Sequence, residues 1–363
     1  MTIILNNKIL LYILPFFIGC LSSLSLPPYN FLILNFLIFP ILLLFLIYNQ
    51  KKKWNSFKIG WSFGFGYFIS NIYWITNSLT FDENFKPLIP IALLTIPLFL
   101  GTFYGFATLI SSLFKLKKNF YSILIFSVIF SLIEFIRGFI LGGFPWNLIA
   151  YSWVNYLNSI QIISFIGTYS FNLISITIFL LPIVIFFDKK LNFKISVLLL
   201  LFLVLILNNY FGHYKINKDN ELNTKIENFK IKIISQKISI SKFFEPNNEG
   251  TLIKELIELS DPNASDKTIF IFPEGALAGV SLKQLKNFKT FFSKKFPNNH
   301  TIIMGINTEK KINNYYKIYN SMVILDNNLN LISEYNKTKL VPFGEFLPFE
   351  KFLKKTTELT PYL

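Results

Sequence analysis

The chain has 363 residues, of which 52% are hydrophobic and only 15% are charged, and its net charge is +15. Soluble domains carry about 25% charged residues, so this composition excludes a single soluble domain of the ordinary kind. The basic excess does not indicate a nucleic-acid partner either, because residues 1–210 hold 13 Lys and Arg against 4 Asp and Glu, mostly in short loops between apolar runs.

Apolar runs follow one another through the first 211 residues. A helix needs about 20 apolar residues to cross the hydrocarbon of a bilayer. Seven runs are close to that length, and we predict a helical membrane domain of about seven spans over residues 1–211. The expected spans are Ile9–Leu26, Phe31–Tyr48, Ile59–Thr76, Leu88–Phe114, Phe120–Ile140, Gln161–Phe187 and Ile195–Phe211.

The loops between these spans alternate in charge. Lysines gather between spans two and three, four and five, and six and seven, whereas the other loops carry few basic residues. Cytoplasmic loops are the ones rich in Lys and Arg. This pattern predicts an N-terminus on the inside and, with seven spans, everything after Phe211 on the outside. In a bacterium that is the periplasmic side of the inner membrane.

The polar residues 212–229 are predicted to be a linker before a soluble domain at 230–363. Between predicted strands, Thr251–Leu259 and Leu282–Phe292 space apolar residues as helices do. Strands that alternate with helices predict an α/β layered domain. Runs rich in β-branched residues predict the strands Lys230–Ser235, Lys267–Phe272, Thr301–Ile306, Asn320–Leu325 and Leu331–Tyr335.

Cysteine and histidine are scarce. Cys20 is the only cysteine and lies inside the first apolar run, and His213 and His300 are far apart in the sequence. Neither residue type follows the spacing of a metal site, and one cysteine cannot form an intrachain disulfide. We therefore predict no metal site built from these residues.

The first candidate for chemistry is a carboxylate at a strand end. The segment Thr268–Gly275 reads as a short buried strand that runs into Pro273, Glu274 and Gly275. An acid on a rigid strand end beside apolar neighbours is a candidate general base. The alternative is a turn with a solvated glutamate, which the pattern alone favours.

The second candidate is the segment Tyr335–Glu345. A predicted strand ends at Lys337, whose ammonium could stabilise an oxyanion, and a turn containing Pro342 and Gly344 then carries Glu345. Taken alone, this segment would be read as a basic surface loop.

Together the two segments resemble the nitrilase, or carbon–nitrogen hydrolase, superfamily. That superfamily uses a Glu–Lys–Cys triad on an α-β-β-α sandwich. With membrane spans in front, the chain is similar to the membrane branch of the superfamily, the apolipoprotein N-acyltransferases. The membrane half agrees at the glycine-rich run Gly60–Tyr67, at Glu134 to Arg137, and at Gly143 to Trp146.

The resemblance implies residue roles. Glu274 would be the general base, Lys337 the lysine that stabilises the oxyanion, and Glu345 an accessory acid. Phe244 stands where the family tends to carry Trp and could contact an acyl chain, and Trp146 would be a second substrate contact. For Trp146 an interfacial anchor is the commoner role, and Glu134 with Arg137 could equally be a structural ion pair.

The resemblance also implies an activity. A cysteine thiolate would take an acyl chain from a phospholipid and pass it to the N-terminal diacylglyceryl-cysteine of an apolipoprotein. The family cysteine follows the lysine by some fifty residues, whereas Leu363 is 26 residues beyond Lys337. We therefore expect a chain cut short at its C-terminus, which lacks the nucleophile and the closing span and is inactive as given.

Two other functions are compatible with parts of the sequence. A membrane-tethered carbon–nitrogen hydrolase, or amidase, would carry the same glutamate and lysine. A transporter or receptor with a soluble binding domain would place ionisable residues or broken helices at mid-membrane, whereas the charges here lie near one end of a span.

Overall fold

A computed structural model describes residues 8–80, 83–140, 143–187, 189–222, 229–235, 249–277, 279–312 and 315–341. The chain divides into two compact units, Met1–Thr224 and Lys225–Leu363.

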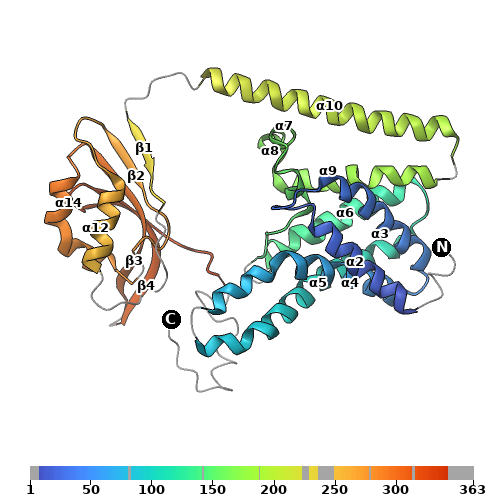
Figure 1. The fold of residues 1–363 in the computed structure, drawn as a ribbon, viewed down its shortest axis with the longest axis horizontal. Helices are drawn as coiled ribbons and strands as arrows, with labels where there is room; N and C mark the ends of the chain where they lie inside the picture. The colour runs from blue at the N-terminus through green and yellow to red at the C-terminus, as the bar shows by residue number, and fades with distance from the viewer. Residues whose placement is uncertain are drawn as a thin grey trace. The chain divides into compact units, whose positions relative to one another are not determined.

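The first unit is helical (Figure 1). Its longer helices pack around a core of buried apolar and aromatic side chains, among them Phe39, Phe63 and Phe130. The helices are α2 (Lys8–Ser23), α3 (Asn35–Asn49) after the short η1 (Leu32–Leu34), α4 (Lys53–Ile72), α5 (Ile89–Leu113), α6 (Phe120–Arg137), α7 (Leu157–Ile160), α8 (Ile163–Ile166), α9 (Thr168–Leu180) and α10 (Leu191–Leu222), with 3-10 segments η2 (Tyr73–Thr80), η3 (Glu83–Leu88), η5 (Ile149–Trp153) and η6 (Leu181–Phe186).

All seven predicted spans fall on helical segments, but only five candidate spans in the described residues are long and apolar enough to cross a membrane. They are Leu32–Asn49, Glu83–Leu113, Phe120–Arg137, Thr168–Phe186 and Leu191–Lys218. The other two expected spans correspond to α2, which has 16 described residues, and to α4, whose sequence contains lysine, asparagine, serine and glycine.

Two predicted boundaries differ from the structure. The expected span Gln161–Phe187 is interrupted at Gly167, whose φ of +77° is incompatible with a continuous right-handed helix, so the long helix begins at Thr168. The expected linker 212–229 is helical as far as Leu222, because α10 continues through its polar end.

Glycines allow α4 to lie very close to its neighbours. A Cβ atom at Gly60 would lie 2.2 Å from the carbonyl oxygen of Tyr104 in α5, and one at Gly66 would lie 2.0 Å from the carbonyl oxygen of Phe16 in α2. Small residues permit this backbone approach in membrane helices, where packing rather than water exclusion drives association. The glycine-rich run is therefore explained by helix packing.

The second unit contains one five-stranded sheet, in the order β1-β2-β3-β4-β5. Strands β1 (Lys230–Ile233), β2 (Thr268–Ile271) and β3 (His300–Ile312) are parallel, and β4 (Tyr315–Asp326) and β5 (Leu331–Asn336) continue the sheet antiparallel. All five predicted strands are confirmed, although β3 and β4 extend into a longer hairpin.

Helices cover one face of this sheet (Figure 1). They are α12 (Glu249–Ser260), α13 (Leu282–Leu285) and α14 (Lys289–Lys295), with η7 (Lys286–Phe288) between the last two. Phe270, Met304 and Val323 point from the sheet into their core, where Leu256 and Phe292 are also buried. The described residues thus form an α/β unit with a small sheet.

Candidate active site

Glu274 lies three residues beyond the end of β2. The ladder to β3 ends at Phe272, whose N–H donates to the carbonyl oxygen of Ile303 at 2.8 Å. Pro273 has no N–H with which to continue the ladder, and Gly275 adopts a φ of +71° that favours glycine. The turn therefore places Glu274 at the strand end, and its side chain is 62% exposed.

Lys337 and Glu274 form an ion pair. The Nζ atom of Lys337 lies 3.1 Å from Oε1 of Glu274. Lys337 follows β5, and its backbone N–H donates to the carbonyl oxygen of Asn320 in β4 at 2.8 Å. Two strand ends that are 63 residues apart in sequence thus meet, and the lysine side chain is only 30% exposed.

Asn320 is a third member of this cluster. Its side-chain amide donates to the same Oε1 of Glu274 at 2.5 Å. From the sequence, Asn320 is predicted only to begin a strand and has no role in the site. Two donors therefore converge on one carboxylate oxygen, an arrangement that orients the carboxylate.

Gly305 in β3 makes room for the glutamate. A Cβ atom at Gly305 would lie 2.7 Å from the Cα atom of Glu274, closer than real side chains approach a backbone. Gly305 was not among the site residues predicted from the sequence. A glycine inside a predicted strand often marks a close backbone approach, and that signal was present at Gly305.

A second polar cluster lies on the helix-covered face of the sheet, near the end of β5. Glu334 accepts hydrogen bonds from the hydroxyl of Thr308 at 3.0 Å and from Nζ of Lys310 at 3.1 Å. Ser321 and Thr308 are both buried and their hydroxyls lie 2.7 Å apart. These contacts connect β5 to β3 and β4 just before Lys337. They therefore help to fix the position of the Lys337 backbone.

Glu134 and Arg137 form a buried network in the membrane unit. Both side chains are fully buried, and Nη2 of Arg137 lies 3.5 Å from Oε1 of Glu134. The hydroxyl of Tyr104 donates to Oε1 of Glu134 at 2.8 Å, and the amide of Asn172 donates to Oε2 at 2.5 Å. The pair therefore connects α5, α6 and α9.

The same network holds the irregular segment after α6. Nη1 of Arg137 donates to the carbonyl oxygens of Phe144 at 2.6 Å and Trp146 at 2.9 Å. The hydroxyl of Tyr67 donates to the carbonyl oxygen of Asn147 at 3.0 Å. Irregular backbone within a membrane domain needs such internal partners. The Trp146 ring is 49% exposed and lies 5.3 Å from the ring of Trp74, measured between centroids.

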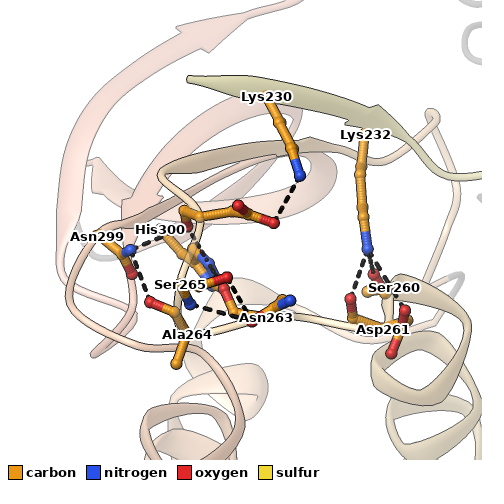
Figure 2. Close-up of polar contacts among 10 residues, drawn as sticks. Lys230, Lys232, Ser260, Asp261, Asn263, Ala264, Ser265, Asn299 and His300 are labelled. Atoms are coloured by element: carbon orange, nitrogen blue, oxygen red, sulfur yellow. Dashed lines mark hydrogen bonds and ion pairs between the residues drawn. The ribbon is translucent and has the colours of Figure 1, made fainter. Parts of the chain in front are cut away.

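The amino ends of β1, β2 and β3 carry a different polar cluster (Figure 2). Nζ of Lys230 lies 2.8 Å from Oδ2 of Asp266, and this hydrogen bond lowers the pKa of the carboxyl group. Nε2 of His300 is 3.0 Å from the carbonyl oxygens of both Asn263 and Asp266. These bonds fix the loop that precedes β2, at the opposite end of the strand from Glu274.

Two predicted site residues, Phe244 and Glu345, lie outside the described residues. Within the described ranges, no three His, Cys, Asp or Glu side chains gather as they would around a metal ion. The structure thus brings Glu274 and Lys337 together, and it holds Trp146 by its backbone in the other unit.

Comparison with known proteins gives one family. Residues 18–181 match the model of the apolipoprotein N-acyltransferase N-terminal domain. An apolipoprotein N-acyltransferase of Rickettsia prowazekii is 31% identical over 345 residues, which is 94% of this chain and 67% of the relative. Those of Brucella melitensis and Rhodopseudomonas palustris are each 27% identical over 93% of this chain, and the match covers 66% and 65% of their lengths. The chain therefore spans about two thirds of the relatives that it matches.

Proposed function

The chain belongs to the apolipoprotein N-acyltransferase family, and on this premise we propose that it acylates lipoproteins. The donor is a phospholipid, and the acceptor is the free α-amino group of the N-terminal diacylglyceryl-cysteine of an apolipoprotein. The observation that carries this proposal is the 3.1 Å contact between Lys337 and Glu274 at two strand ends.

In the first half-reaction, the Glu274 carboxylate accepts a proton from a cysteine thiol. The thiolate attacks the ester carbonyl of the phospholipid, and the Lys337 ammonium stabilises the resulting oxyanion. The ester C–O bond breaks, the lysophospholipid leaves with the proton, and a thioester remains. We assign this role to a cysteine other than Cys20, which lies inside the apolar helix α2.

In the second half-reaction, the amine of the apolipoprotein attacks the thioester. Glu274 accepts the amine proton and returns it to the departing thiolate, while Lys337 again faces the oxyanion. We assign Glu345 the role of an accessory acid, and Phe244 and Trp146 the role of contacts to lipid substrates. Nothing in these steps needs a metal or an organic cofactor.

We place the protein in the bacterial inner membrane with seven spans and its N-terminus inside. The lysine-rich loops support this orientation, which puts the soluble domain on the periplasmic side, where both lipid substrates have head groups. We further propose the domain bounds 1–211 and 230–363, with the intervening residues beginning as the polar end of α10, and a nitrilase-like α-β-β-α sandwich for the second domain. The sheet with helices on one face is compatible with half of such a sandwich.

The test uses the complete open reading frame that encodes these residues, expressed in cells depleted of their own enzyme. Glu274→Gln and Lys337→Met should each lower the rate of addition of the third acyl chain by about 100-fold or more, measured by mass spectrometry of a lipoprotein. Glu258→Gln and Lys317→Met change an exposed acid and an exposed lysine elsewhere in the unit and should leave the rate unchanged. Rates near wild type for both site variants would show that these residues are not the catalytic pair.

A further inference from the structure

The segment that contains α13 and α14 is strongly basic. No Asp or Glu occurs between Gly275 and Thr308. Within this stretch, five lysines lie in or beside the two helices, and all five are exposed. These lysines, here termed the α13–α14 basic face, are Lys283, Lys286, Lys289, Lys294 and Lys295.

The basic face points outward because the apolar residues between the lysines point inward. Leu282, Leu285 and Phe292 are buried in the core of the unit, as is Phe296 just after α14. The hydroxyl of Ser281 and the side chain of Gln284 form a capping box that fixes where α13 begins. The segment is therefore amphipathic and fixed in position: its apolar side is buried in the core, and its cationic side is exposed to solvent.

Few acids neutralise this face. Glu249 in α12 accepts a hydrogen bond from the Gln284 amide at 3.3 Å, and Asp326 is near enough to interact electrostatically with Lys289. Asp326 already accepts hydrogen bonds from the backbone N–H groups of Asn328 and Asn330. Within the described part of the chain, none of the five lysines forms an ion pair. A positive potential over the two helices is the consequence.

We propose that the α13–α14 basic face binds anionic phospholipid head groups at the surface of the bilayer. An anionic membrane surface attracts a polybasic cluster, and each Lys near the surface adds to the attraction. Only seven residues separate the end of α10 at Leu222 from β1 at Lys230, so the unit is tethered to a helix that is apolar enough to span a membrane. The tether keeps lipid at a high effective concentration, which favours lipid over a dissolved acidic macromolecule.

The test uses the chain in lipid nanodiscs, with Cys20→Ala and a fluorophore attached through Asn287→Cys, an exposed position between two of the lysines. Quenching by neutral acrylamide reports exposure of the label. Replacing phosphatidylcholine by about 30 mol% phosphatidylglycerol should lower the quenching constant about threefold, and about 0.5 M NaCl should restore it.

A matched pair of triple variants separates this face from the net charge of the chain. Lys283→Gln, Lys286→Gln and Lys294→Gln together should abolish the effect of phosphatidylglycerol. Lys254→Gln, Lys267→Gln and Lys317→Gln remove the same charge from other exposed positions and should retain it. Equal quenching in both kinds of disc, or equal loss in both triple variants, would overturn the proposal. The readout is independent of acyl transfer, so its failure leaves the proposed activity untouched.

Discussion

Nζ of Lys337 and Oε1 of Glu274 lie 3.1 Å apart, although the residues follow different strands of the sheet. The backbone of Lys337 is itself paired with Asn320 by a 2.8 Å hydrogen bond, and Glu274 lies two residues after Phe272, which makes the last ladder contact with β3. Rigid strands rather than long loops therefore fix both charges, and a site built on such elements holds its geometry well.

Gly305→Ala should displace Glu274, because the added methyl group would meet its Cα atom at 2.7 Å. We expect a loss of about 1–3 kcal/mol in the free energy of unfolding from overpacking and a fall in acyl transfer of about 10-fold or more. Urea unfolding and the lipoprotein assay check the two effects.

Gly250→Ala is the matched control, since the nearest atom to a new Cβ there is Cε1 of Phe288, at 3.8 Å. It should retain full activity and change stability by less than about 1 kcal/mol. Equal effects of the two substitutions would mean that close packing at Gly305 does not position the glutamate.

Asn320→Asp should move the acid side of the pH–activity profile to higher pH. The new carboxylate would stand where the amide now donates to Glu274 at 2.5 Å, and repulsion between like charges favours the protonated glutamate. A general base works only when deprotonated. The pH at which kcat is half-maximal on the acid side should therefore rise by about one unit. Asn320→Ala removes the donor without adding a charge and should shift the profile less. A profile identical to wild type in Asn320→Asp would rule out this contact in the active protein.

The sequence predicted the strands of the second unit and the two strand ends that carry Glu274 and Lys337. Short sequence segments are sufficient to predict these strands and their ends, because runs of β-branched residues bounded by turn residues are local signals. Asn320 and Gly305 were missed because their roles depend on which strands become neighbours. Pairing of β2 with β3 and of β3 with β4 is a property of the whole sheet, and no local pattern at Asn320 encodes it.

In the first unit, the sequence located apolar stretches better than helix ends. Gly167 breaks the sixth predicted span through a positive φ, and α10 continues beyond the predicted end of the last span. The spacing of Glu134 and Arg137 indicated an ion pair. It could not indicate that Tyr104 and Asn172 complete the network, because these residues come from helices that are distant in sequence.

Two ion pairs in the first unit share the same i,i+3 spacing and differ in burial, so they allow a direct comparison. Glu134→Ala leaves the buried Arg137 without its carboxylate partner. We expect the free energy of unfolding to fall by about 3–5 kcal/mol. Glu83→Ala breaks the exposed pair with Lys86 and should cost less than about 1 kcal/mol. Denaturation of the purified protein in detergent measures both. Glu134→Gln can still accept a hydrogen bond from Tyr104, so its loss in free energy of unfolding should lie between those of the two alanine variants. A similar small loss in all three variants would contradict a stabilising role for the buried network.

Asp326 should make the β4–β5 hairpin sensitive to acid. Burial opposes ionisation of its carboxyl group, but hydrogen bonds from the backbone and side chain of Asn330 and the backbone of Asn328 outweigh it and lower the pKa. A group whose folded pKa is depressed stabilises the fold above its unfolded pKa of about 3.9, and that stability is lost as pH falls through the folded value.

Asp326→Ala should therefore weaken hydrogen-exchange protection of the β4 amides by about 1–2 kcal/mol near pH 6, and the difference from wild type should shrink below about pH 4. Exchange rates corrected for their intrinsic pH dependence measure this. Asn328→Ala keeps its backbone N–H donor to Asp326 and should retain the wild-type protection at both pH values. A difference between wild type and Asp326→Ala that is constant from pH 6 to the acid range would show that ionisation of Asp326 does not support the turn.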